Sequence, residues 1–187
     1  MHTAFRAKLK FVIVFVISII VVVFVLNNAV KIIYPLKYRE YVYKYSVDNN
    51  IDPYLVFAVI KAESSFNPWA VSPKKARGLM QISEITGNWV AESLGIDGFS
   101  AEMLFEPEIN IQIGCWYLST LMTEFNNNLD LVIAAYNAGS GNVNKWLKSK
   151  DYSSSGSYLE RIPFKETELY LRKVKTYYSV YRGLYEA

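Results

Sequence analysis

The 187-residue sequence has one histidine and one cysteine, and this scarcity excludes several kinds of catalytic site. The histidine is His2, which precedes a long hydrophobic segment, so no Ser/His/Asp or Cys/His arrangement can form in the region after that segment. A zinc site built on imidazole is excluded for the same reason. Cys115 has no partner for an intrachain disulfide, and its helical, apolar context predicts a small buried side chain. We therefore expect a fold held by packing alone, with no metal.

Signatures of nucleotide and nucleic-acid binding are also missing. The stretch "NAGSGN" follows a predicted helix instead of a strand, and it lacks the Lys-Ser/Thr ending of a phosphate-binding loop. The net charge of +3 is small, and no block of five or six like charges marks a nucleic-acid-binding arm. We expect no nucleic-acid partner and no organic cofactor. Carboxylates remain as the groups able to carry chemistry.

A hydrophobic run, "FVIVFVISIIVVVFVL", occupies residues 11–26 and follows Arg6, Lys8 and Lys10. This pattern is typical of a signal sequence or signal anchor. At 1.5 Å per residue the run spans about 24 Å, and a helix that continues to residue 30 approaches the roughly 30 Å of a bilayer core. No clear small-x-small cleavage site follows, which favours a retained anchor. A cleaved signal is the alternative.

The chain is thus predicted to have four parts. These are a cytoplasmic tail over residues 1–10, a transmembrane anchor over 11–30, a juxtamembrane helix over 31–50 and one globular domain over 51–187. Basic residues after the run dilute the positive-inside bias, so the orientation rests partly on the function argued below. We expect a single-pass protein of the cell membrane, with its domain on the extracytoplasmic side.

The globular part is predicted to be all-α. Asp52 and Pro53 combine an N-cap residue with a proline at the first helical position, and the helix that they start is expected to end near Ser65. No alternating strand pattern with hairpin turns stands out. Further helices are predicted over residues 84–94, 107–125, 129–137, 142–148 and 166–185.

Glu63 is the leading candidate for a catalytic acid. On a helical period it lies on the same face as Val56, Val59 and Ile60, where side chains are covered by the core. Burial would raise its pKa, and so would the negative end of the helix dipole in the last turn. A carboxyl group that keeps its proton near neutral pH suits cleavage of a glycosidic bond. The alternative is a glutamate that reaches solvent at a frayed helix end.

Four segments carry a family resemblance. They are "ESSFNPWAVSP" (63–73), "ARGLMQI" (76–82), "AAYNAGSGNV" (134–143) and "IPFKETELYL" (162–171). In this order they resemble the motifs of the soluble lytic transglycosylase family, whose catalytic unit is called the transglycosylase SLT domain and is similar in fold to goose-type lysozyme. The resemblance covers about residues 50–182. It implies an all-α, lysozyme-like catalytic domain over 51–187.

The resemblance implies roles for particular residues. Glu63 matches the single catalytic acid/base of the family. Seven further positions are implied to contact substrate: Ser72, Met80, Gln81, Tyr136, Asn137, Glu166 and Tyr170. Structural alternatives exist for single positions, because Met80 can fill the core and Asn137 can cap a helix. Three positions depart from the family pattern and put subsite detail in doubt: Ser83, Ser140 and Glu168.

The implied substrate is peptidoglycan. The family cleaves the β-1,4 bond between N-acetylmuramic acid and N-acetylglucosamine without water, giving 1,6-anhydromuramyl ends, and needs no cofactor. Two alternatives remain, a lysozyme-like hydrolase and a non-catalytic glycan-binding protein of the same fold. Four aromatic residues are candidates for stacking on sugars: Phe66, Trp69, Trp89 and Tyr136.

Overall fold

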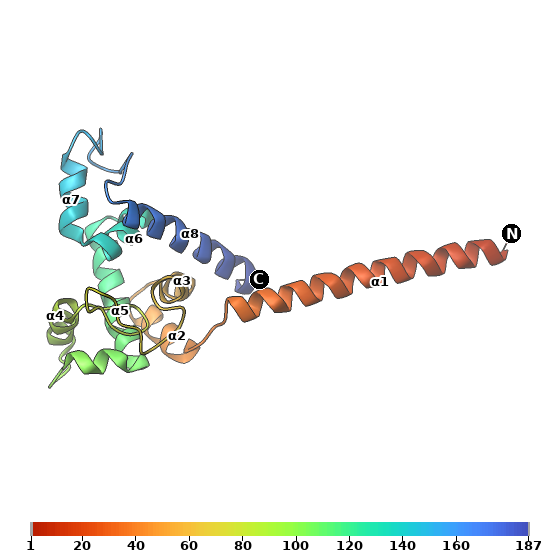
Figure 1. Cartoon of the computed structure of the whole chain (residues 1–187), viewed down its shortest axis with the longest axis horizontal. Helices are drawn as coiled ribbons and strands as arrows, with labels where there is room; N and C mark the ends of the chain where they lie inside the picture. The colour runs from red at the N-terminus through yellow and green to blue at the C-terminus, as the bar shows by residue number, and fades with distance from the viewer. Residues whose placement is uncertain (1, 187) are drawn as a thin grey trace. The chain divides into compact units, whose positions relative to one another are not determined.

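The structure is a computed structural model that describes the backbone of residues 2–186 and the side chains from residue 11 onward, except those at 12, 13, 27 and 187. Within these residues it is all-helical apart from two isolated β-bridges, as predicted. The helices are α1 (His2–Ile33), α2 (Arg39–Asp48), α3 (Pro53–Glu63), α4 (Glu84–Leu94), the 3-10 helix η1 (Ala101–Phe105), α5 (Pro107–Glu124), α6 (Leu129–Ala138), α7 (Ser140–Lys148) and α8 (Lys165–Tyr185) (Figure 1).

The helix α1 forms a unit of its own, Met1–Pro35. Its segment Val14–Ile33 is long and apolar enough to cross a membrane, with 20 residues and a mean hydropathy of 2.5. None of this segment is buried within the structure. Pro35 lies two residues after Ile33, and because a proline disfavours helical geometry at the residue before it, here Tyr34, the helix ends at Ile33. The continuous juxtamembrane helix predicted over residues 31–50 is therefore interrupted at 34–38.

The second unit, Leu36–Ala187, includes α2. Val42 and Tyr45 on α2 are buried, and the Tyr45 hydroxyl donates a hydrogen bond of 2.8 Å to Glu108 at the start of α5. The predicted boundary at residue 51 thus lies too late in the chain. Of the three buried residues of α2, only Val42 is aliphatic, and the other two, Tyr45 and Ser46, are of types that do not distinguish a core helix from a surface one.

The central helix of this unit is α3. The Asp52 side chain accepts a hydrogen bond of 2.8 Å from the Tyr54 N–H, which confirms the predicted N-cap. Six consecutive residues, 55–60, are buried, so α3 is covered on all sides by neighbouring helices, chiefly α2 and α8. Its last residue is Glu63. The core therefore ends at the carboxyl group that the sequence singled out.

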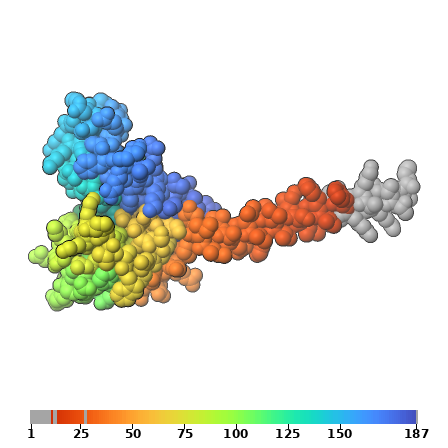
Figure 2. Space-filling model, viewed as in Figure 1, coloured from red at the N-terminus to blue at the C-terminus, as the bar shows by residue number. Residues whose placement is uncertain are grey.

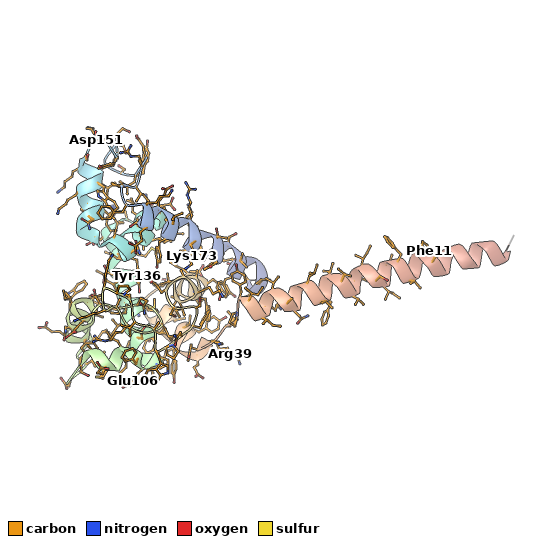
Figure 3. All side chains as sticks on the ribbon, in the orientation of Figure 1. Phe11, Arg39, Glu106, Tyr136, Asp151 and Lys173 are labelled. Carbon is orange, nitrogen blue, oxygen red and sulfur yellow. The ribbon has the colours of Figure 1, made fainter. Side chains whose placement is uncertain are left out.

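In the second unit, α2 to α5 gather on one side and α6 to α8 on the other (Figure 1). Tyr136 on α6 lies where these two groups meet (Figure 3). The segment that joins α3 to α4 lies at the same junction, seen in yellow between the green and blue parts of the surface (Figure 2). In α7 the helix starts at Ser140, two residues earlier than predicted, because Gly139 (φ 85°) turns the chain in a single residue.

Candidate active site

Glu63 lies partly buried at the end of α3 and lines a cavity of about 340 Å³. Burial raises the pKa of its carboxyl group to about 7. The Tyr170 hydroxyl and the Lys173 ammonium group lower this pKa, and the charge of Glu166 raises it, but burial is the largest effect. The direction and the main cause are those predicted from the helical position of Glu63. The carboxyl group therefore keeps its proton to a much higher pH than an exposed glutamate does.

Tyr170 on α8 is buried beside Glu63. Its side chain is 8% exposed, and its hydroxyl oxygen has no hydrogen-bond partner of ordinary geometry among the described residues. It still lies close enough to the Glu63 carboxyl for the two groups to influence each other's pKa. Burial and the charge of Glu63 keep the pKa of Tyr170 well above its usual value, so the phenol remains neutral. Its O–H is available as a donor to the carboxylate form of Glu63.

The cavity at Glu63 brings together most of the residues that the sequence singled out. Six of those eight residues line it: Glu63, Ser72, Gln81, Tyr136, Asn137 and Glu166. They come from α3, the segment after α3, α6 and α8, which are far apart in the sequence. Met80 and Tyr170 do not line it. The cavity is otherwise lined by Pro73, Lys74 and Ala76.

One wall of the cavity is formed by the segment between α3 and α4. The Ser72 hydroxyl accepts a hydrogen bond of 3.0 Å from the Ala76 N–H, which closes a short loop. Gln81 adopts a left-handed backbone conformation (φ 51°), and its side-chain amide donates to the carbonyls of Ala70 and Gly78 at 3.0 and 2.9 Å. These bonds fix the side chain of Gln81, whose amide oxygen remains as an acceptor at the cavity wall.

Met80 does not line the cavity, contrary to the prediction. Its side chain is fully buried and lies against Gly114, where a Cβ atom would approach the Met80 sulfur to 2.2 Å. The left-handed conformation of Gln81 turns the chain, so that Met80 is buried whereas the adjacent Gln81 is partly exposed. Met80 contributes through its main chain instead. Its carbonyl accepts a hydrogen bond of 2.9 Å from the Tyr136 hydroxyl.

Sequence reasoning missed Asn110, which is fully buried on α5. Its side-chain oxygen accepts from the Met80 N–H at 2.8 Å, and its amide donates to the carbonyls of Arg77 at 3.0 Å and Leu104 at 2.7 Å. Gly78 (φ +78°) lets this side chain approach, since a Cβ there would lie 2.3 Å from the Asn110 nitrogen. A lone asparagine in the apolar stretch "INIQIGC" was the signal that could have indicated it.

The opposite wall joins α6 to α8. The Thr167 hydroxyl donates a hydrogen bond of 2.8 Å to the side-chain oxygen of Asn137. Glu166 is exposed and lies 3.7 Å from the Lys74 ammonium group, so this ion pair crosses the cavity mouth. Glu166 is also the second carboxylate in the cavity. Among the described residues, no three His, Cys, Asp or Glu side chains gather as a metal-binding group.

The four aromatic candidates for sugar stacking differ in exposure and in the cavities that they line. Phe66 is 4% exposed and belongs to the core, whereas Trp69 is 71% exposed but lines none of the cavities described. Tyr136 lines the cavity, with its ring centroid 5.5 Å from that of Tyr117. The ring centroid of Trp89 lies 6.2 Å from that of Tyr117, and Trp89 lines a separate cavity. Only Tyr136 and Trp89 of the four are therefore placed to meet a ligand in these cavities.

The chain is similar to known proteins over most of its second unit. A family model described as the transglycosylase SLT domain matches residues 40–158. Soluble lytic murein transglycosylase of Escherichia coli (strain K12) is 37% identical over 151 residues, which are 80% of this chain and 23% of that protein. Membrane-bound lytic murein transglycosylase C of Edwardsiella ictaluri (strain 93-146) is 35% identical over 169 residues, 79% of this chain and 47% of that protein.

Solved structures give the same likeness. An inactive mutant of the lytic transglycosylase Slt from Pseudomonas aeruginosa superposes with a TM-score of 0.73 and 33% identity, covering 82% of this chain and 25% of that one. The 70 kDa soluble lytic transglycosylase of Escherichia coli gives a TM-score of 0.73 and 36% identity, over 80% and 25% of the two chains. The chain thus spans about a quarter of the soluble relatives that it matches.

Proposed function

Since the chain belongs to the transglycosylase SLT domain family, we propose that it is a membrane-anchored lytic transglycosylase of peptidoglycan. The observation that carries this proposal is the raised pKa of Glu63, about 7, in a cavity lined by five other residues at motif positions. A carboxyl group that is neutral near pH 7 can give a proton to a glycosidic oxygen. Names of similar proteins, soluble and membrane-bound murein transglycosylases, point to the same substrate.

In the proposed reaction, Glu63 first protonates the glycosidic oxygen that joins N-acetylmuramic acid to N-acetylglucosamine. The N-acetylglucosamine end then leaves with this oxygen. The resulting carboxylate then takes the proton of the muramyl C6 hydroxyl, which attacks C1 and closes the 1,6-anhydro ring. This nucleophile belongs to the substrate, so its effective concentration is high and no activated water is needed. The Tyr170 hydroxyl, buried beside Glu63 without an ordinary partner, would stabilise the carboxylate between the two steps.

The remaining cavity residues would position the glycan. We propose that Ser72, Gln81 and Asn137 bind its polar groups, because their side chains line the cavity and are held by hydrogen bonds to the protein. Tyr136 offers a ring beside the reacting sugar. Met80 would act through its main-chain carbonyl, which holds the Tyr136 hydroxyl.

The anchor is proposed from α1. A predominantly apolar segment of 20 residues near the N-terminus, Val14–Ile33, is long and apolar enough for a membrane span. We infer a single-pass protein with the domain on the extracytoplasmic side, where peptidoglycan lies. Along the chain, two residues separate the end of this span at Ile33 from the start of the second unit at Leu36.

Glu166 supports the alternative of a lysozyme-like hydrolase, because it places a second carboxylate in the same cavity. A digest of purified peptidoglycan with the full chain in detergent, followed by mass spectrometry of the released muropeptides, separates the two reactions. Anhydromuramyl ends support the proposal, and reducing ends support hydrolysis. Glu63→Gln is the matched control and is expected to release neither. Absence of both products with wild-type protein would indicate a non-catalytic glycan-binding protein.

A further inference from the structure

Thr167 is a buried polar residue to which the proposed reaction gives no role. It is the third residue of α8 and is 1% exposed. Its hydroxyl donates a hydrogen bond of 2.8 Å to the side-chain oxygen of Asn137 on α6, and this is the one hydrogen bond that the Thr167 side chain makes among the described residues. Thr167 does not line the cavity at Glu63, whereas Asn137 does. Any effect of Thr167 on the cavity therefore passes through Asn137.

This hydrogen bond decides which end of the Asn137 amide is left for the cavity. A side-chain amide has an oxygen that accepts and an NH2 group that donates, and the two ends are close in size. If the amide were turned around, its NH2 group would donate to the Thr167 oxygen, and the Thr167 O–H would lose its acceptor. A buried donor without an acceptor is costly, so the observed orientation is favoured. Asn137 thus keeps its NH2 group for a ligand.

Gln81 has the opposite polarity on the facing wall of the cavity. Its NH2 group donates to the carbonyls of Ala70 and Gly78 at 3.0 and 2.9 Å, so both of its donors are used. The side-chain oxygen is the group that remains for a ligand. Gln81 belongs to the segment between α3 and α4, and Asn137 belongs to α6. The cavity therefore has a fixed acceptor on one wall and a fixed donor on the other.

An acetamido group on a sugar matches this pair. The amide is planar and trans, so its N–H and its C=O point in opposite directions. Its N–H can donate to the Gln81 oxygen while its C=O accepts from the Asn137 NH2 group. A protonated amino group, which remains when the acetyl group is removed, offers donors only. It would meet the Asn137 NH2 group donor to donor, so this polarity distinguishes N-acetylated from de-N-acetylated glycan.

We propose that Thr167 is a positioning residue that holds the Asn137 amide with its NH2 group toward the substrate and so makes the protein selective for N-acetylated glycan. This inference rests on the proposed function for the identity of the polymer. Because the orientation is set before binding, no free energy is spent on turning the amide when the glycan enters. The buried hydroxyl thus determines specificity from behind the cavity wall.

Thr167→Val tests the inference, because valine keeps the branched shape of threonine and lacks the hydroxyl. The full chain in detergent, in the Glu63→Gln background, is titrated by calorimetry with peptide-free glycan strands, either N-acetylated or de-N-acetylated. The pH is kept below the pKa of the free amino group. We expect Thr167→Val to weaken Kd for N-acetylated strands about tenfold, the contribution of one hydrogen bond, with little change for de-N-acetylated strands. Thr167→Ser, which keeps the hydroxyl, should restore most of the loss.

Two further variants separate positioning from a general effect on the fold. Thr176→Val is the matched control, because Thr176 is an exposed threonine of α8 whose hydroxyl donates to the Arg172 carbonyl at 2.8 Å. It should leave both dissociation constants unchanged. Asn137→Asp keeps an oxygen for Thr167 and replaces the NH2 group with a second acceptor. It should reverse the preference, toward de-N-acetylated strands.

The preference for N-acetylated strands is the decisive quantity, since the charge of the amino group acts equally on wild type and Thr167→Val. A loss of equal size on both kinds of strand, with thermal midpoints showing folded protein, would mean that Thr167 has a structural role only and would overturn the proposal. So would an unchanged preference in Asn137→Asp, which also decides the matter if Thr167→Val does not fold. If the protein with Glu63 intact cleaves nothing while the preference depends on Thr167, the proposed function fails and the positioning role stands.

Discussion

The Tyr136 hydroxyl donates a hydrogen bond of 2.9 Å to the main-chain carbonyl of Met80. This bond ties α6 to the segment between α3 and α4, two parts of the chain that are 56 residues apart. The same peptide segment is held from the other side by Asn110, which accepts a bond from the Met80 N–H. Met80 thus connects a buried polar residue of α5 with the cavity wall.

The pH dependence of cleavage should report the Glu63 carboxyl. Its pKa is raised to about 7, so the protonated acid predominates below pH 7 and is lost above it. We therefore expect kcat/KM on peptide-free glycan strands to fall about tenfold for each pH unit well above pH 7. Thermal midpoints across the same range control for unfolding. A rate that stays level up to pH 9 would contradict the role of Glu63 as the acid.

Two neighbouring charges should shift the pH above which kcat/KM falls, in opposite directions. The Lys173 ammonium group lowers the pKa of Glu63, and the Glu166 carboxylate raises it. Lys173→Met is therefore expected to shift the falling limb of kcat/KM to higher pH, and Glu166→Gln to lower pH. Lys175→Met removes a cation two residues further along α8, which pairs with Asp130, and serves as the control. Shifts of the same sign in both variants would show that the limb does not belong to Glu63.

Replacement of Glu63 should stabilise the domain at alkaline pH. The carboxyl has a pKa of about 7 when folded and 4.5 as its reference, so the folded state binds more protons than the unfolded state between these values. The free energy of unfolding then falls as pH rises through this window, by at most about 3 kcal/mol. Solvent contact of the partly buried side chain reduces that amount. We expect Glu63→Gln to raise stability by about 1 to 3 kcal/mol at pH 8 and by much less at pH 4.5.

Chemical denaturation of both proteins at the two pH values measures this difference. Glu124→Gln, a change of the same kind at an exposed glutamate on α5, is the matched control. If the stability difference between Glu63→Gln and wild type does not change with pH, then burial does not raise the pKa of the Glu63 carboxyl.

Tyr136→Phe removes the bond to Met80 and leaves the ring in place. A buried carbonyl without its donor costs about 1 to 2 kcal/mol, so we expect a loss of that size in the free energy of unfolding. For a domain of this size the thermal midpoint should fall by several degrees, about 2 to 4 °C per kcal/mol. Tyr117→Phe makes the same change on the adjacent ring, for which the structure describes no hydrogen bond. Equal effects of the two substitutions would exclude a specific contribution of this bond.

Asn110→Leu keeps a side chain of similar size but removes three hydrogen bonds at once. The Met80 N–H and the carbonyls of Arg77 and Leu104 would remain without the partner that they have now. We expect the free energy of unfolding to fall by about 3 to 5 kcal/mol. Asn88→Leu, at an exposed asparagine on α4, should change it by less than about 0.5 kcal/mol. Urea denaturation of the three proteins gives the comparison, and a small effect at Asn110 would contradict its assigned role.

The sequence by itself determined the features that depend on neighbours along the chain. The N-cap of Asp52, the proline after it and the apolar residues that follow fix where α3 begins and which residues it buries. The same local pattern put Glu63 at the end of a buried helix, from which the direction of its pKa shift follows. Absence of histidine after residue 2 left a carboxylate as the reactive group.

Only the tertiary structure decided what meets that carboxyl group. Tyr170, Lys173 and Glu166 reach it because α8 packs on α3, more than a hundred residues away in the sequence. Three other features were likewise not predicted. They are the packing of α2 into the domain, the three hydrogen bonds of Asn110 and the different exposures of Met80 and Gln81. Local propensities act over a few residues, whereas these arrangements arise when separate helices exclude water together. Such contacts leave no periodic signal in a single sequence.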